Sequence, residues 1–210
     1  PGSHCATSQS PHLIMTPKLV IASRNEHKIQ EMRRILEQAG IHVELVGTAE
    51  FPDLPDVEET GSTFAANAML KARAVSEFTG LAAVGDDSGL CVDALNGMPG
   101  ILSARWSGSH GNDSANLELL LAQISQVPAD RRNASFVCAA AYANPDGTEF
   151  VVEGEMNGSL ITAPLGDNGF GYDPIFIPTG HQITSAQMSS EEKDAISHRG
   201  KALAALVALL

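Results

Sequence analysis

The feature that most constrains the fold is a strand, a tight polar turn and a helix in direct succession near the start of the chain. Lys18-Leu-Val-Ile-Ala22 is short, apolar and rich in β-branched residues, which is typical of a buried strand. Ser23-Arg-Asn25 forms the turn, and apolar residues then recur at helical spacing up to Gly40, which is suited to end a helix. This order predicts an α/β fold, with residues 41–46 as the second strand.

The rest of the chain predicts a sheet of mixed direction. Strands alternate with helices in the first half, whereas Asn144-Pro-Asp-Gly147 later joins two strands as a hairpin. Ser189 and Glu192 have the spacing of a capping box, which begins a C-terminal helical region. The predicted elements are a loop over 47–61, a helix over 63–78, a strand over 81–84 with a turn over 85–89, a helix over 114–127, hairpin strands over 135–142 and 149–155, and a strand over 174–177.

The overall composition excludes several classes of protein. The net charge of −12 repels polyanions, which argues against nucleic acid and anionic membranes as partners, and no apolar run approaches the ~20 residues of a membrane span. Three distant cysteines without a CxxC pair favour a reducing cytoplasm. Pro1-Gly-Ser3 resembles the scar of a removed expression tag, so we expect residues 1–17 to be a disordered leader and residues 18–210 to form a single domain.

The turn after the first strand is a candidate phosphate site. Ser23, Asn25 and Lys28 lie where the free N–H groups and partial positive charge of a helix N-terminus attract anions. Ordinary helix capping by Ser and Asn, beside a solvated lysine, explains the same residues without a ligand.

Acidic residues form two further candidate segments. Glu59 precedes the second helix, on which Asn67 and Lys71 share a face at i and i+4. Asp86 and Asp87 follow an apolar strand, where ligands of open α/β sheets bind, and adjacent carboxylates favour a cation such as Mg²⁺. The alternative for Asn67 and Lys71 is an ordinary solvated helix face, and the alternative for Asp86 and Asp87 is an Asx turn with a solvated second aspartate.

Two segments suit the recognition of a planar ligand. Gly169-Phe-Gly-Tyr-Asp-Pro-Ile-Phe176 allows close backbone approach, and Phe170 can stack on a base. Lys193 and Ser197-His-Arg-Gly200 place donors for carbonyl oxygens within two helical turns. A glycine-rich turn and a solvated helix start are the alternatives.

Together these segments closely resemble the inosine triphosphate pyrophosphatase family, also called XTP/dITP diphosphatases, over residues 18–210. The resemblance depends on the segments above in their order, on Glu58-Glu-Thr-Gly61, and on Pro99-Gly-Ile101 with Ser103-Ala-Arg-Trp106. It implies an elongated mixed β-sheet with flanking helices, two lobes around a deep cleft, and a homodimer. It also implies the conversion of ITP, dITP and XTP into the monophosphate and pyrophosphate, which cleanses the nucleotide pool before incorporation into DNA and RNA.

The resemblance also assigns roles to residues of this chain. Glu59 and Asp87 would hold Mg²⁺, and Asp87 would activate the attacking water with support from Asp86. Phe170 would stack on the purine, oriented by Asp173. The substrate-binding residues it implies are Ser23, Arg24, Asn25, Glu26, His27, Lys28, Asn67, Lys71, Asp86, Ser88, Phe170, Gly171, Tyr172, Asp173, Lys193, His198 and Arg199.

Three other functions fit parts of the sequence. A nucleotide-binding sensor would have no need of Glu59 and Asp87, and a pyrophosphatase of modified pyrimidine nucleotides would not be expected to carry the purine-type segment at 197–199. A haloacid-dehalogenase-type phosphatase needs an Asp-x-Asp pattern after a strand, which the predicted strands lack.

Overall fold

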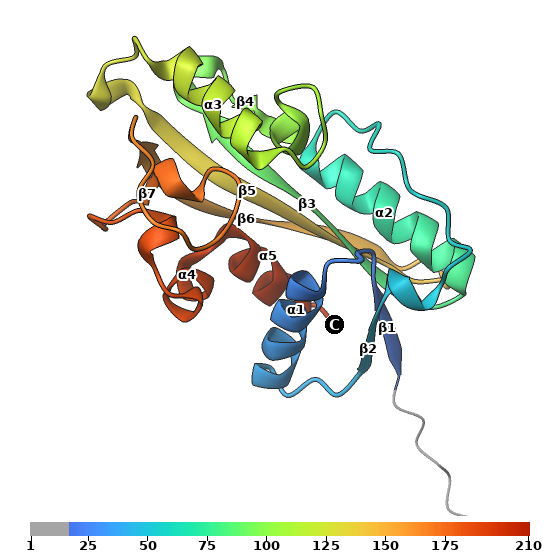
Figure 1. Cartoon of the computed structure of the whole chain (residues 1–210). Helices are drawn as coiled ribbons and strands as arrows, with labels where there is room; N and C mark the ends of the chain where they lie inside the picture. The colour runs from blue at the N-terminus through green and yellow to red at the C-terminus, as the bar shows by residue number, and fades with distance from the viewer. Residues whose placement is uncertain (1–16) are drawn as a thin grey trace, which may run out of the picture.

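The computed structural model describes residues 17–210, except for the side chain of His27, so the predicted leader lies outside the described residues apart from Pro17. Within these described residues, seven strands form one sheet, and five α-helices flank it (Figure 1). The strands are β1 (Lys18–Ile21), β2 (Glu44–Gly47), β3 (Ala82–Val92), β4 (Met98–Pro99), β5 (Asn133–Ala143), β6 (Glu149–Leu160) and β7 (Phe176–Pro178). The helices are α1 (Glu26–Gln38), α2 (Phe64–Thr79), α3 (Asp113–Ile124), α4 (Ser190–Ile196) and α5 (His198–Val207).

The predicted mixed sheet with flanking helices is confirmed. Its order is β2-β1-β3-β5-β6-β7, with β4 paired to β3, and β1 runs parallel to both β2 and β3 whereas the later pairs are antiparallel. In Figure 1, α2 and α3 cover one face of the long strands, and α1, α4 and α5 lie on the other. None of the helices in residues 17–210 combines the length and apolarity that crossing a bilayer requires.

Apolar residues on both faces of the sheet hold the helices in place. Met32 and Leu36 of α1 pack with Leu203 and Leu206 of α5 in one buried cluster. On the opposite face, small residues of β5 and of α2 form another cluster with Phe64, so that α2 lies close to the strands. The capping box predicted at Ser189 and Glu192 is present at the start of α4. These contacts fix the helix ends that surround the site.

The prediction of a short strand followed by a turn at residues 85–89 is wrong. The chain continues through these residues as part of β3, which pairs with β5 from Ala83 to Val92. Gly85 and Gly89 serve helix packing here, because a Cβ would clash with the Ala68 carbonyl oxygen at the first and with the Gly100 carbonyl oxygen at the second. The two glycines therefore mark close backbone approaches.

Other predicted boundaries shift as well. The helix predicted over 114–127 spans Asp113–Ile124, and the strand predicted over 149–155 runs to Leu160. β2 begins at Glu44, since residues 41–43 have no regular structure. The strand expected from Pro174 begins at Phe176, because Pro174 lies in the 3-10 segment Asp173–Ile175, where its fixed φ fits.

Candidate active site

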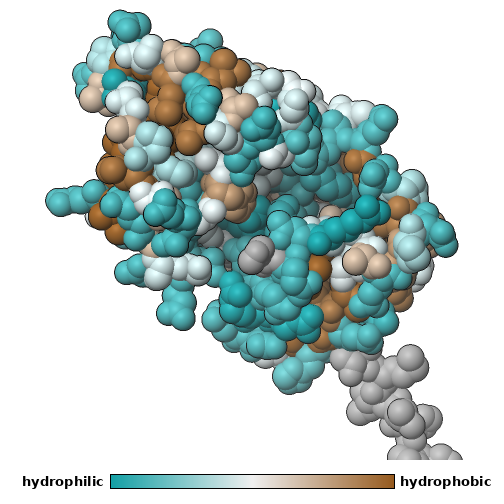
Figure 2. All heavy atoms as spheres, viewed as in Figure 1, coloured by the Kyte–Doolittle hydropathy of each residue, from teal (hydrophilic) through white to brown (hydrophobic). Residues whose placement is uncertain are grey.

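Two neighbouring cavities are lined by residues that follow β1. The larger, about 440 Å³, lies between the strands and α1, α4 and α5, and the smaller, about 310 Å³, lies between the 54–59 loop, α1 and α2. Lys28 lines both of them. Figure 2 shows this face of the molecule hollowed near its centre, with mainly hydrophilic residues around the hollow. Lys28 is therefore placed to contact a ligand in either cavity.

The end of β1 leaves one edge of β3 open at the predicted acidic pair. β1 pairs with β3 only as far as Val84, and the Asp86 carbonyl oxygen accepts a hydrogen bond from Lys71 Nζ at 2.8 Å. Side chains alternate along a strand, so Asp86 faces α1 and α5 whereas Asp87 faces α2. The two adjacent carboxylates thus belong to different surroundings.

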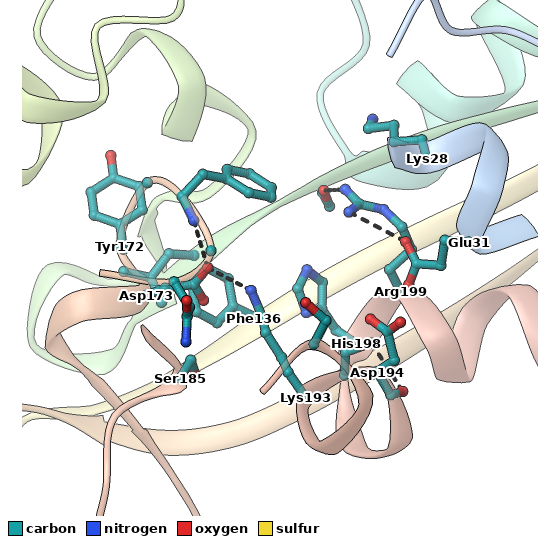
Figure 3. Close-up of a pocket in the computed structure, with 18 of the residues that line it drawn as sticks. Lys28, Glu31, Phe136, Tyr172, Asp173, Ser185, Lys193, Asp194, His198 and Arg199 are labelled. Carbon is teal, nitrogen blue, oxygen red and sulfur yellow. Dashed lines mark hydrogen bonds and ion pairs between the residues drawn. The ribbon is translucent and has the colours of Figure 1, made fainter. Parts of the chain in front are cut away.

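Asp86 lies in a cluster of positive charge. Its carboxylate accepts hydrogen bonds from Lys28 Nζ at 2.8 and 3.0 Å and from Arg199 Nε at 3.3 Å. Burial would raise its pKa, but the charges of Lys28 and Arg199 outweigh this effect and hold the pKa of Asp86 well below its usual range. Asp86 is therefore an ionised group that fixes two cations. Figure 3 shows Arg199 beside Glu31, whose carboxylate lies 3.8 Å from Arg199 Nη1.

Asp87 and Glu59 converge on Lys71. Lys71 Nζ lies 2.6 Å from Glu59 Oε1 and 3.6 Å from Asp87 Oδ1. Burial raises the pKa of Asp87, and the charge of Lys71 and the hydrogen bond from Asn67 offset this only in part. Burial also acts to raise the pKa of Glu59, but hydrogen bonds from Lys71 and Arg105 outweigh it and lower that pKa. Glu59 is thus the weaker base of the two carboxylates and Asp87 the stronger one.

Aromatic and basic side chains line the far part of the large cavity (Figure 3). Asp173 accepts hydrogen bonds from Lys193 Nζ and from the Phe170 N–H, and Lys193 Nζ lies 5.5 Å from the centre of the Phe170 ring. Phe170 itself is 62% exposed, so its face is open to a planar ligand. His198 stacks on Phe136 with ring centres 5.0 Å apart.

His198 is a neutral side chain in this arrangement. Burial, together with the nearby charges of Arg199 and Lys193, lowers the pKa of His198 to about 3. Its Nδ1 atom is buried and has no hydrogen-bond partner among the described residues. A buried polar atom without a partner is costly, so a ligand that supplies one would be favoured.

The structure brings most of the predicted site residues to the cavities. Those lining the large cavity are Asn25, Lys28, Ser88, Phe170, Gly171, Tyr172, Asp173, Lys193, His198 and Arg199. Those lining the small cavity are Ser23, Arg24, Lys28, Glu59, Lys71 and Asp86.

Four predicted residues lie elsewhere or cannot be placed. Glu26 lines neither cavity and accepts a hydrogen bond from Gln30, and the side chain of His27 is outside the described part of the chain. Asn67 is fully buried: its Oδ1 accepts from the Gly61 N–H and its Nδ2 donates to Asp87. Asp87 lies behind Lys71 and lines neither cavity.

A family model described as the Ham1 family matches residues 19–209. The chain belongs to the Ham1 family. It is 60% identical to a dITP/XTP pyrophosphatase of Streptomyces coelicolor, over 90% of this chain and 95% of the relative. It is 56% identical to a dITP/XTP pyrophosphatase of Mycobacteroides abscessus, over 92% of this chain and 94% of that relative. The resemblance inferred from the sequence is thus confirmed.

Solved structures agree with the Ham1 assignment. The chain matches a crystal structure titled nucleoside-triphosphatase / dITP/XTP pyrophosphatase from Mycobacterium abscessus with a TM-score of 0.77 and 57% identity, covering 90% of this chain and 97% of that one. It matches a HAM1 protein from Coxiella burnetii with a TM-score of 0.85 and 40% identity, covering 92% and 98%.

Sequence reasoning missed several residues of this Ham1 site. Glu31 lies one helical turn after Lys28, a spacing that would have placed it on the same face of α1. Arg105 was part of a segment quoted only for the resemblance, and Phe136 was assigned only to a hairpin strand. Ser103, from the same segment as Arg105, also lines the large cavity, as do Asp113, Asn116 and Ser185, which no local pattern marks.

Proposed function

We propose that this chain hydrolyses dITP, XTP and ITP to the nucleoside monophosphate and pyrophosphate, as a cytoplasmic, homodimeric enzyme that removes deaminated purine nucleotides. The observation that carries the proposal is that Lys28 lines both cavities, with the open face of Phe170 in the large one and the carboxylates of Glu59 and Asp86 in the small one. The names of relatives that are 54–60% identical support the substrate class.

The large cavity suits the base and the small one suits the phosphates. Phe170 offers a stacking face, and Lys193, His198 and Arg199 offer donors to the 6-oxo group. Adenine carries an amino donor at this position, so a donor would face a donor, which costs ~1–3 kcal/mol. Ser23 and Lys28 then meet the triphosphate beside the start of α1.

Glu59 and Asp87 fit a divalent cation. Their oxygens already converge on one positive charge, the Lys71 ammonium, and carboxylates that share a cation with phosphate oxygens are typical of Mg²⁺ sites. Among residues 17–210, no group of three or more acidic, histidine or cysteine side chains is arranged to hold a metal. When bound, Mg²⁺ would offset the negative charge of the phosphates.

Asp87 is the residue suited to take a proton from the attacking water. Its raised pKa makes the carboxylate a better base than an ordinary aspartate, and Asn67 fixes its orientation. Water then bonds to the α-phosphorus, and the bond from that phosphorus to the α,β-bridging oxygen breaks. Pyrophosphate leaves with the bridging oxygen.

Product identity tests the proposal. The full chain is incubated with dITP, XTP, GTP and ATP in the presence of Mg²⁺, and the products are separated by anion exchange. We expect monophosphate and pyrophosphate from dITP and XTP, and much slower turnover of ATP. Release of orthophosphate, or tight nucleotide binding without turnover, would refute it.

A further inference from the structure

Glu59 depends on side chains from other elements for its orientation. It lies in residues 51–63, which contain neither helix nor strand, although the Gly61 N–H donates to Asn67 Oδ1 at 2.7 Å. Its two carboxylate oxygens have separate partners. Lys71 binds Oε1 at 2.6 Å, and Arg105 Nη1 binds Oε2 at 2.9 Å.

Arg105 comes from a segment that is firmly attached to β3. It ends the 3-10 helix Gly100–Arg105, in which Ser103 Oγ accepts from the Leu90 N–H at 2.9 Å and donates to the Gly100 carbonyl at 2.6 Å. Tyr172 donates its hydroxyl to the Ser103 carbonyl at 2.9 Å. The backbone of Arg105 is therefore held in place relative to β3, and its side chain binds the carboxylate of Glu59, which lies in a loop.

We propose that Arg105 is a positioning residue for the cation site: it holds Glu59 through Oε2 and so keeps Oε1 directed toward Asp87. Lys71 has the other role, since its ammonium occupies the point where the two carboxylates converge. A divalent cation must displace Lys71 from Oε1, whereas Arg105 can stay in place. The inference builds on the cation site of the proposed function.

The two basic residues should therefore have opposite effects on metal binding. Simple electrostatics predicts that loss of either positive charge strengthens cation binding. Positioning by Arg105 predicts the reverse for that residue, because side chains that hydrogen-bond to metal ligands typically contribute 10- to 100-fold in metal affinity.

The test measures the affinity of the nucleotide-free protein for Mn²⁺, by calorimetry and by the electron paramagnetic resonance signal of free Mn²⁺. Arg105→Gln should weaken binding by ~10-fold or more, and Lys71→Met should strengthen it. Arg105→Lys, which keeps the charge and loses the planar fork, should fall between Arg105→Gln and the wild type and serves if Arg105→Gln does not fold. Arg73→Gln is the matched control, since it removes an arginine from the exposed pair with Glu149 and should leave the affinity unchanged.

Activity measurements give a second readout. In Arg105→Gln the Mg²⁺ concentration for half-maximal rate should rise by the same factor, with an unchanged KM for dITP at saturating Mg²⁺. Equal or stronger Mn²⁺ binding by Arg105→Gln, or no Mn²⁺ binding by the wild type at millimolar concentration, overturns the inference. Mn²⁺ binding with the expected order of affinities but no hydrolysis of dITP would refute the proposed function alone.

Discussion

Asp86→Asn should destabilise the folded protein strongly. The Asp86 side chain is only 11% exposed and compensates both Lys28, at 2.8 Å, and Arg199, at 3.3 Å. Removing one partner of a buried ion pair costs ~3–5 kcal/mol. The amide retains one acceptor oxygen, so we expect a loss near the lower end, about 3 kcal/mol in the free energy of unfolding. For a chain of this length that corresponds to a Tm lower by roughly 6–12 °C.

Urea unfolding followed by circular dichroism at pH 7.5 measures the effect, and Asp87→Asn is the matched control. Both variants lose one negative charge at neighbouring positions of β3. In Asp87→Asn the new amide N–H₂ group faces a hydrogen-bond donor, Asn67 or the Ser88 N–H, which is unfavourable. Burial already disfavours the negative charge of Asp87, so removing that charge offsets part of this cost. We therefore expect a loss of no more than about 1 kcal/mol in the free energy of unfolding. Equal stability of the two variants, or an Asp86→Asn variant as stable as the wild type, would refute the reasoning.

The pH dependence of stability provides a further check on Asp86. Its pKa in the folded protein lies below the ordinary value of 3.8, so the unfolded chain takes up the proton first as the pH falls. The stability that Asp86 contributes is therefore complete above about pH 4.5 and is lost as the pH falls further toward the folded pKa. This part of the acid-induced loss should be missing in Asp86→Asn.

Three other measurements test the site. Asp87→Asn should lower kcat for dITP by ~100- to 10,000-fold, because an amide cannot take a proton from water, and a pyrophosphate-release rate within tenfold of wild type would contradict that role. The pKa of His198 is near 3 in the folded protein against an ordinary 6.5, so in mild acid only the unfolded chain binds a proton at this residue. Between pH 7.5 and 5 the free energy of unfolding of the wild type should therefore fall by ~2 kcal/mol more than that of His198→Gln. Parallel curves of stability against pH for the two proteins would contradict a neutral, buried His198. Arg199→Ala should narrow the preference for dITP over ATP by ~1–3 kcal/mol in kcat/KM, whereas an equal loss for both substrates would assign Arg199 to the triphosphate.

Local sequence patterns predicted the elements whose residues interact with near neighbours. The helical spacing before Gly40, the hairpin around Asn144-Pro-Asp-Gly147 and the capping box at Ser189 each depend on residues only a few positions apart. Asn67 and Lys71 were correctly placed on one face of α2, because both reach the aspartates of β3. These features follow from propensity and periodicity alone.

The partners of the charged residues could not be predicted in this way. Arg199 meets Asp86 across 113 positions of the chain, and Arg105 meets Glu59 across 46. Such pairs arise only when the sheet order brings β3, α5 and the 3-10 helix together. The same limit applies to His198, whose Nδ1 has no hydrogen-bond partner in residues 17–210, because nothing near residue 198 in the sequence shows that its ring stacks on Phe136.

The misassigned turn at residues 85–89 shows what the adjacent aspartates accomplish. In a turn, both carboxylates would have faced the same solvent and repelled each other, and the sequence alone favoured a shared cation as compensation. In a strand, the alternation of side chains sends Asp86 to Lys28 and Arg199 on one face and Asp87 to Lys71 and Asn67 on the other. One short segment can therefore fix the cations of the large cavity through Asp86 and supply, through Asp87, a more basic carboxylate beside Lys71. This arrangement depends on β3 continuing past the end of β1, and glycines at 85 and 89 let the flanking backbones approach the strand there. The packing of the neighbouring backbones against β3 and the placement of the two carboxylates thus depend on the same segment, residues 85–89.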